Sequence, residues 1–388
     1  MRRVTPRRCL VPRWLAAGFS RLGPSDHGAV AIVVALLLTP VLLGFAVLVV
    51  DGGQLFDEHR QLRSGADAAA VAVAQLCAQQ TTCASAATTR AKDVAQANDS
   101  TDSGSGGAVV VDRVCGTLRD LPACPARPSN APALSSCPAW TPYVYYAEVR
   151  LRTGTPDGRN VITTAFSNRS VPVASCARAG AAAPTSLTSA LPVTIAKCVI
   201  DAYKAKSGHN SDLAPEPPYG SNRSTWETAV VTSNTSDSCT GQRYGGNYGT
   251  VDDGKTYDAG DGTSKCPVTT TVGSTVTGGS SSLTSQCSTS TMNALLNTIV
   301  FLPVFETVSG TSSAPKYLVT GYAPFFLTGW RFSKSNYYET SVTSSVKCSS
   351  SSTCLYGMYT RGFAPAPGPF DPSTDPRPLG TAVVKLVG

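Results

Sequence analysis

The side chains that could perform acid–base or nucleophilic chemistry are few and scattered. The sequence holds three histidines, His27, His59 and His209. A serine-hydrolase triad would have to recruit His209, which stands in a Lys-Ser-Gly-His-Asn-Ser stretch, and no nucleophile elbow occurs elsewhere. That stretch is typical of a solvated loop. Metalloprotease, phosphate-binding and dinucleotide-binding fingerprints do not occur either. The sequence therefore predicts a protein that is not an enzyme and that has no cofactor.

One segment, 252–262, gathers four aspartates and three glycines. Clustered carboxylates with flexible turns can wrap oxygen ligands around Ca²⁺. The segment lacks the glutamate that closes an EF-hand loop, and acidic turns of this kind are ordinarily solvated. We therefore predict no metal site.

The thirteen cysteines fall on two sides of a long apolar run. Cys9 precedes the run and the other twelve follow it, an even number that suits disulfides in an oxidising compartment. Cys-x-x-Cys pairs are absent, so a zinc site has no support. Spacing suggests three pairs, which are Cys77–Cys83, Cys115–Cys124 and Cys348–Cys354.

The first of these pairs sets a condition on the backbone. On a continuous helix, six residues of rise would separate Cys77 and Cys83 by about 9 Å between Cα atoms. A disulfide needs less than about 7 Å. If these two cysteines pair, the helix must end near Ala78 and the following Gln-Gln-Thr-Thr stretch must turn back.

The apolar run itself, 28–50, is predicted to be a transmembrane helix. Its 23 uncharged residues span roughly 34 Å as a helix, enough to cross a hydrocarbon core of about 30 Å. A cleavable signal peptide has a shorter apolar region and a small-x-small cleavage site, whereas this run ends in Val49-Val50-Asp51. A buried core helix and a twin-arginine signal fit less well. We expect an uncleaved signal anchor in the cell membrane.

Charge sets the expected orientation and argues against one class of partner. Six arginines and one aspartate lie in residues 1–27, which therefore carry most of the formal net charge of +7. By the positive-inside rule, this basic tail stays in the cytoplasm and the region after Val50 is extracytoplasmic. The basic excess is local, so a nucleic-acid-binding face is not expected.

The helical pattern continues beyond the apolar run, through 51–97. Small and large apolar residues recur every seven positions, at Leu48, Leu55, Leu62, Ala69 and Leu76 among others. The pattern predicts one long juxtamembrane helix, with a hinge candidate at Gly52-Gly53. Its alanine-rich part permits close approach of another backbone. Two interpretations stay open: the helix packs on its own domain, or it docks a partner protein.

Residues 28–74 resemble the N-terminal region of the TadG-like Flp pilus-assembly proteins. In that family a Gly-Ala-x-Ala start opens the membrane span, an Asp follows the span, and a Leu-x-x-x-Ala-Asp-Ala-Ala-Ala block comes next. The matching positions are Gly28, Asp51, Gly52, Leu62, Ala66, Asp67, Ala68, Ala69 and Ala70. The resemblance implies a membrane-anchored accessory of a tight-adherence pilus secretion system.

Two departures from that family narrow the expectation. Related prepilins carry Glu five residues after the cleaved Gly, whereas Val33 stands there, so processing into a pilin subunit is not expected. Larger members carry an Asp-x-Ser-x-Ser metal site. The nearest string here, Asp99-Ser100-Thr101-Asp102-Ser103, follows an alanine-rich helix instead of an apolar strand. The shorter, actinobacterial-type form fits better.

The region 98–388 is expected to be a β-rich, disulfide-tied domain, which makes the fold class α+β. Expected strands cover 109–114, 143–152, 161–167, 191–199, 299–308, 316–323, 325–332 and 381–387. A loop-rich insert is expected at about 208–290. The apolar stretch Ala294–Phe305 is too short to cross a membrane and is expected to be a buried strand.

Two functions follow from these patterns. The leading hypothesis is a non-enzymatic, membrane-anchored component of a Flp/Tad-type pilus-assembly or secretion apparatus. Its expected partners are the lipid bilayer, other membrane proteins of that system, and a second copy contacted through the juxtamembrane helix. The alternative is a surface-anchored binding or cell-wall-associated protein unrelated to pili. Exposed aromatic side chains such as Tyr244 and Trp330 would suit its contacts.

Overall fold

The structure is a computed structural model of the 388-residue chain. The chain divides into two compact units, Met1–Glu58 with Ile162–Val171, and His59–Val161 with Pro172–Gly388. The expected α+β class, an N-terminal apolar helix followed by a β-rich region with disulfides, is confirmed. The residues that the structure describes are 27–80, 82–98, 108–125, 137, 143–154, 162–163, 170–171, 173–215, 223–231, 248–252, 266–278, 286–311, 313–364, 370–373, 375 and 378–387.

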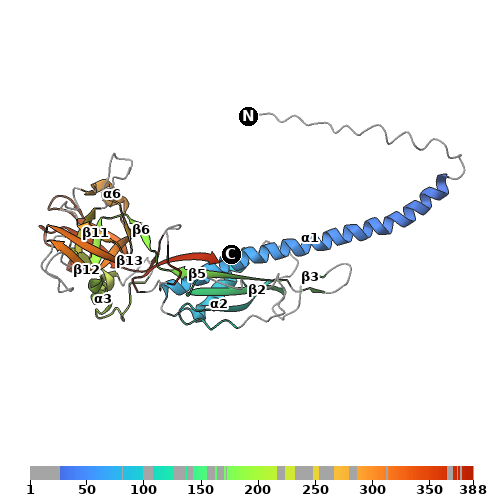
Figure 1. The fold of residues 1–388 in the computed structure, drawn as a ribbon, viewed down its shortest axis with the longest axis horizontal. Coiled ribbons are helices and arrows are strands. Elements are labelled where there is room, and N and C mark those ends of the chain that lie inside the picture. Colours follow the sequence, from blue (N-terminus) through green and yellow to red (C-terminus); the bar gives the residue numbers. More distant parts are fainter. Residues whose placement is uncertain are drawn as a thin grey trace, which may run out of the picture. The chain divides into compact units, whose positions relative to one another are not determined.

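The longest element is helix α1, His27–Gln79, with 53 residues (Figure 1). Pro40 stands inside it and lacks a backbone donor. The hydroxyl of Thr39 donates to the carbonyl oxygen of Ala35 at 2.6 Å, a back-bond common in apolar helices. The first unit also holds a short antiparallel hairpin, β3 (Ile162–Thr163) with β4 (Ser170–Val171).

The helical region expected over 51–97 is two helices rather than one. Helix α1 ends at Gln79, and α2 begins at Ala84 and ends at Ala97. The turn between them is closed by the disulfide Cys77–Cys83, with a Cα–Cα distance of 5.1 Å. The carboxylate of Asp120 accepts from the backbone N–H groups of Cys83 and Ala84 at 2.8 and 3.2 Å. These contacts satisfy donors that a helix start leaves open, and they lower the pKa of Asp120.

In the second unit, a five-stranded sheet supports these helices. Its strand order is β1-β2-β5-β17-β16, and β1–β2, β2–β5 and β5–β17 pair antiparallel. The last pair, β17 with β16, is parallel. The strands are β1 (Ala108–Gly116), β2 (Tyr146–Gly154), β5 (Ala174–Ala182), β16 (Gly362–Phe363) and β17 (Thr381–Val387).

A second sheet of eight strands holds the larger hydrophobic core. Its order is β11-β9-β7-β12-β13-β15-β8, with β14 added beside β13. Because β11 pairs with both β9 and β13, five of these strands form a closed ring, which leaves those strands fewer open edges. The strands are β7 (Val193–Ala196), β8 (Thr228–Val231), β9 (Tyr248–Asp252), β11 (Thr275–Gly278), β12 (Ile299–Thr311), β13 (Ala314–Arg331), β14 (Tyr337–Tyr338) and β15 (Cys354–Tyr359).

Short elements complete the second unit around the two sheets. The strands β6 and β10 pair antiparallel as a separate two-stranded sheet. The remaining elements are β6 (Ser186–Ser189), α3 (Lys197–Lys204), α4 (Arg223–Trp226), β10 (Val268–Thr271), α6 (Thr289–Ala294) and the 3₁₀ turn η4 (Ser344–Val346).

Several predicted elements need correction. The strand expected over 191–199 ends at Ala196, and α3 follows at once. The two strands expected over 316–323 and 325–332 are one strand, β13. In Ala294–Phe305 the strand starts only at Ile299. The region 208–290 is not merely loops, since four of its described segments, β8 to β11, pair in the sheets. Much of the strand expected over 161–167 lies outside the described residues.

Buried carboxylates fix irregular segments to the second sheet. Glu227 follows α4 and accepts from Arg223 at 2.9 Å, from the hydroxyl of Thr328, and from the backbone N–H of Thr343 at 2.8 Å. Burial alone would raise the pKa of Glu227, but these hydrogen bonds outweigh burial and lower it. Glu227 thus joins a helix end, a strand and a loop at one point.

A second buried carboxylate, Glu339, forms a forked ion pair. Arg331 donates from Nε and Nη2 to its two oxygens at 2.5 and 2.6 Å, and the hydroxyl of Tyr356 donates at 2.6 Å. The guanidinium also lies 4.5 Å from the ring centroid of Tyr337. Glu339 is 7% exposed and Arg331 9%. The bonds from Arg331 hold the pKa of Glu339 below its ordinary value, against the opposing effect of burial.

The Glu339 pair predicts sensitivity to acid. Its stabilisation is complete above the ordinary carboxyl pKa of 4.5 and is lost as the pH falls through the lowered folded-state value. We expect Glu339→Gln to lower the free energy of unfolding at pH 7 by about 3–5 kcal/mol, because it leaves Arg331 buried without its counter-ion. Denaturant unfolding between pH 7 and pH 3 measures this effect.

The control for that measurement is Glu306→Gln. Glu306 pairs with Lys197 at 3.4 Å on the surface, where its side chain is 56% exposed. This substitution should cost less than about 1 kcal/mol at pH 7. A loss of stability on acidification that is equally steep in wild type and Glu339→Gln would contradict the assignment.

Candidate functional site

The first half of α1 presents an apolar surface to its surroundings. The stretch Ala31–Val50 has a mean hydropathy of 2.9, and none of it is buried within the described structure. Leu36 and Leu37 are 70% and 66% exposed. Such a surface is unfavourable in water, and this helix is long and apolar enough to cross a membrane. Together with the disulfides, it indicates a membrane-anchored, extracytoplasmic protein.

Positions of the family resemblance and of the seven-residue pattern lie along this one helix. Gly28, Asp51, Gly52 and Leu55 all fall within α1. The side chains of Asp51 and Leu55 are outside the described residues, so the structure adds nothing on their contacts. The expected boundary at residue 50 does not interrupt the helix, which runs through Gly52-Gly53.

The alanine-rich part of α1 is buried by its own chain. Leu62 is 3% exposed, Ala66 and Ala69 are fully buried, and Leu76 is half-buried. A methyl group built on Gly65 would lie 3.6 Å from the side chain of Leu151 in β2 and 3.6 Å from the carbonyl oxygen of Ala95 in α2. Of the two interpretations left open, these contacts favour packing on its own domain.

Asp67 is the one ionisable side chain of the alanine block. It is half-buried in α1 beside Ala66. Loss of hydration raises the pKa of Asp67, and the positive charge of Arg63, one turn earlier, offsets part of that rise. A half-buried carboxylate is a cost to the fold, so Asp67 is a candidate for a role other than stability.

The end of α1 is tied to the segment between the two sheets. Arg361 lies between β15 and β16, where the chain passes from the eight-stranded to the five-stranded sheet. Its Nη1 donates to the carbonyl oxygen of Gln79, the last residue of α1, and its Nη2 pairs with the carboxylate of Asp212. A cation at a helix C-terminus also meets the negative end of the helix dipole. Arg361 therefore couples the helix end, the 209–215 turn and both sheets.

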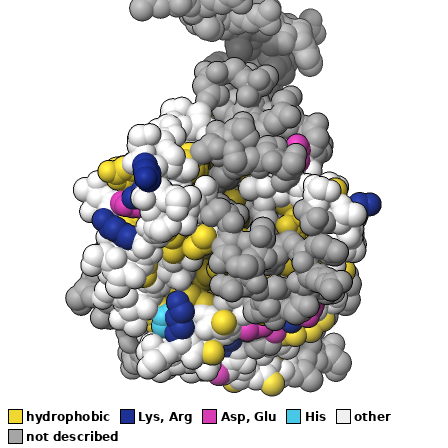
Figure 2. All heavy atoms as spheres, turned by 90° about the vertical axis from the view of Figure 1, so that its left-hand side faces the viewer, with side chains coloured by type: hydrophobic (Ala, Val, Ile, Leu, Met, Phe, Trp, Pro, Cys, Tyr) yellow, Lys and Arg dark blue, Asp and Glu magenta, His cyan; other side chains and the backbone are white. Residues whose placement is uncertain are grey.

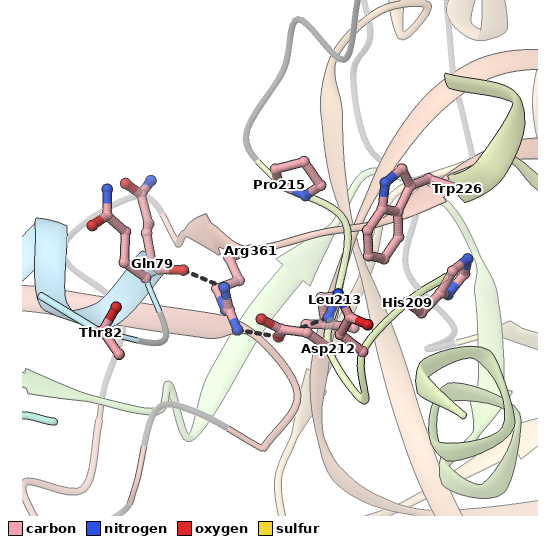
Figure 3. Close-up of a pocket in the computed structure, with 10 residues that line it drawn as sticks. Gln79, Thr82, His209, Asp212, Leu213, Pro215, Trp226 and Arg361 are labelled. Carbon is pink, nitrogen blue, oxygen red and sulfur yellow. Dashed lines mark hydrogen bonds and ion pairs between the residues drawn. The ribbon is translucent and has the colours of Figure 1, made fainter. Parts of the chain in front are cut away.

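A cleft of about 520 Å³ opens beside Arg361 (Figure 3). Figure 3 shows Gln79 and Thr82 on one side, His209 and Trp226 on the other, and the Arg361–Asp212 pair between them. Its lining residues are Gln79, Gln80, Thr82, His209, Asn210, Asp212, Leu213, Pro215, Trp226 and Arg361.

Two predictions about aromatic residues were wrong. His209 is not solvated but 1% exposed, because its ring stacks on Trp226 with centroids 4.2 Å apart. Its Nδ1 and Nε2 lie 2.6 and 2.9 Å from the carbonyl oxygens of Tyr203 and Thr225. Trp330, expected to be exposed, is 1% exposed in the core. Tyr244 lies outside the described residues. The periodicity of the sequence did not indicate that His209 or Trp330 would be buried.

The three cysteine pairs suggested by spacing are joined in the structure. They are Cys77–Cys83, Cys115–Cys124 and Cys348–Cys354. Two further disulfides, Cys137–Cys176 and Cys266–Cys287, bridge longer separations, and Cys198 is also disulfide-bonded. Local spacing carries no signal for those longer links.

The clusters of metal-ligating residue types in the described part of the chain are built on these bonded sulfurs. Both groups of three combine Glu148 with the two sulfurs of a disulfide, Cys115–Cys124 in one and Cys137–Cys176 in the other. Sulfurs in a disulfide are not thiolates, which are the form that binds metals. Of the segment 252–262 considered for Ca²⁺, Asp252 ends β9 and the rest lies outside the described residues.

Among the described residues, charged side chains do not form a continuous patch on the face in Figure 2. That face shows Lys, Arg, Asp and Glu side chains scattered among apolar and neutral polar ones. A nucleic-acid-binding surface would instead gather positive charge along one face. This observation agrees with the local placement of basic residues near the start of the sequence.

Comparison with known families matches the anchor and its packed extension. Residues 28–76 match the model of the family described as Putative Flp pilus-assembly TadE/G-like. No curated protein and no solved structure matches the chain significantly. The matched segment starts in the first turn of α1 and ends just before the Cys77–Cys83 turn. It therefore coincides with the anchor helix and its buried alanine face and leaves the β-rich region unassigned.

Because the alanine face of α1 is buried, we predict that larger side chains on it destabilise the fold. We expect Ala69→Leu to destabilise the fold by about 1–3 kcal/mol, because a fully buried methyl group leaves no room for three further carbons. Denaturant unfolding in micelles measures the change. The control is Ala97→Leu at the exposed end of α2, which should change stability by less than about 0.5 kcal/mol. Equal effects at the two positions would show that α1 is not packed against α2 and β2.

Proposed function

We propose that this chain is a non-enzymatic, membrane-anchored component of a Flp/Tad-type pilus-assembly or secretion apparatus. The observation that carries the proposal is the TadE/G-like match over 28–76, which coincides with a helix long and apolar enough to span a membrane. The wider outer region adds support through its disulfides, which suit an oxidising compartment.

In this proposal, the basic residues 1–27 lie in the cytoplasm and the region after Val50 lies outside. Six arginines precede the span, and the positive-inside rule retains such a segment in the cytoplasm. The position of the cysteines agrees, since twelve of the thirteen follow the span. The chain would be a single-pass protein of the shorter, actinobacterial type.

The contacts within the second unit limit which surfaces a pilus-system partner would use. Ala66 and Ala69 are covered by the chain itself, so the alanine face is not offered to another protein. The outer part of α1 keeps Arg60, Arg63 and Ser64 exposed. Association with a partner or a second copy would then use this polar flank or the apolar span within the bilayer.

The test is complementation of a deletion strain. We expect deletion to reduce piliation, and the wild-type chain and Leu38→Ile to restore it. Leu38→Arg should fail, because a central arginine costs about 2.5–3.5 kcal/mol on insertion. Electron microscopy of pili and cross-linking of the chain to pilus-system membrane proteins are the measurements. Unchanged piliation after deletion, with no pilus component cross-linked, would refute the proposal.

Orientation can be determined from Cys9, the one cysteine that precedes the span. We expect a membrane-impermeant maleimide to leave the chain unlabelled in intact cells and to label it once the cells are permeabilised. Cys9→Ala should remain unlabelled in both conditions, which controls for thiols elsewhere in the chain. Labelling of wild type in intact cells, absent in Cys9→Ala, would place the tail outside.

A second candidate function is a surface-anchored binding or cell-wall-associated protein unrelated to pili. The cleft beside Arg361 is the observation that favours it, since a lined cavity in the outer region serves no purpose in simple anchoring.

A further inference from the structure

The cleft beside Arg361 has the size of a small-ligand site. Its volume of about 520 Å³ falls in the range of roughly 300–1,000 Å³ that is typical of such sites. Its walls come from the turn after α1, the 209–215 turn, the end of α4 and the β15–β16 connection (Figure 3). The cleft therefore gathers segments that are far apart in the sequence.

The charges lining the cleft are already compensated. Arg361 is paired with Asp212 and with the C-terminal carbonyl of α1. Both ring nitrogens of His209 are directed at main-chain carbonyl oxygens. Among the lining residues that the structure describes, no other is ionisable. An ionic ligand would therefore find no unpaired charge among these described residues, which favour a neutral ligand.

Other residues that line the cleft supply uncharged hydrogen-bond donors and acceptors. Gln80, Asn210 and Thr82 are exposed and carry two amides and a hydroxyl. An amide offers an acceptor and two donors, and a hydroxyl offers both kinds. Such groups can satisfy a ligand that is itself rich in hydroxyls.

One wall of the cleft is apolar and held in place. Trp226 is half-buried, and its ring stacks on His209, which is itself held edge-on against Tyr203 at 4.5 Å. The indole cannot turn without breaking this stack, so it is preorganised for contact with a ligand. Leu213 and Pro215 extend the apolar wall. A flat apolar wall facing a polar rim matches a sugar ring, which has C–H faces and a hydroxyl edge.

A peptide fits this lining less well. Peptides commonly bind by adding a strand to an open sheet edge or by laying a helix into an apolar groove. The described lining comes from turns and helix ends, so it offers no strand edge for main-chain pairing. The cleft is also lined by more polar side chains than an apolar groove that binds a helix.

We propose that the cleft lined by Gln80, Asn210 and Trp226 binds a neutral saccharide, such as a segment of an envelope glycan. The site goes beyond a role in pilus assembly and does not depend on it. Because Arg361 joins the same cleft to the end of α1, a bound sugar would contact both the helix end and the β-rich region.

Binding can be tested with the full chain in micelles of a detergent without a sugar headgroup. The probes are chitotetraose, maltotetraose and an arabinogalactan oligosaccharide, with a neutral tetrapeptide in parallel. We expect one saccharide to bind with a dissociation constant of about 0.1–1 mM, measured by saturation-transfer NMR and calorimetry. The Gln80→Ala, Asn210→Gly double variant should weaken that binding at least tenfold.

The two substitutions are chosen to leave the fold intact. Both side chains are exposed, and Asn210 has φ 51°, a conformation that glycine adopts readily. The matched control is Gln96→Ala, an exposed glutamine of α2 that is not in the lining, which should bind like wild type. Unchanged thermal unfolding of all variants confirms that they are folded. Saturation by no saccharide at about 5 mM, binding of the peptide alone, or equal affinity in the double variant and control would each overturn the proposal.

Discussion

The second unit depends on how closely one helix can approach its own chain. The face of α1 at Ala66 and Ala69 carries only methyl groups between the buried Leu62 and Val73, and Gly65 lacks even a methyl group where α2 and β2 come near. Small side chains give close contact but little interlocking between helix and sheet. The end of the helix is accordingly held by other means, a disulfide to Cys83 and hydrogen bonds from Arg119 and Arg361 to its last carbonyl oxygens.

Few charges stabilise the rest of the unit, and the buried carboxylates make their contacts either across neighbouring strands or between a strand and a connecting segment. Only 15% of the chain is charged. Three buried glutamates each meet arginine: Glu148 with Arg113 and Arg178, and two others in the eight-stranded region. Removing one partner of such a buried pair is costly, so the contacts of Glu227 and Glu339 fix the segments that they join to the eight-stranded sheet. The pairs of Glu148 join three neighbouring strands of the five-stranded sheet instead.

The sequence predicted what depends on local pattern. A 23-residue uncharged run indicated the apolar helix, alternating residues indicated β1 and β2, and short spacing indicated three cysteine pairs. It did not predict what depends on distant partners. The stretch 208–290 looked like loops because β8 to β11 are each four or five residues long and gain their stability from strands far away in sequence.

The candidate cleft shows the same limit. His209 sits in a polar stretch that is typical of a surface loop, yet it is buried because Trp226 and Tyr203 close over it. Arg361 carried no sequence signal, since its partners Gln79 and Asp212 are 282 and 149 residues away. Local reasoning finds the helix that anchors the chain, whereas the cavity beside its end exists only after the chain has folded.

The position of β17 has a consequence for biogenesis. This strand, 381–387, inserts between β5 and β16 and so completes the sheet on which the alanine-rich helices rest. During synthesis, the membrane helix emerges first and the strand that finishes its support emerges more than 300 residues later. In the orientation proposed above, the region after Val50 therefore crosses the membrane before its five-stranded sheet can close. Until then the sheet that packs against the alanine face is incomplete. A chain that ends before β17 would therefore be more easily cleaved by proteases of the cell envelope.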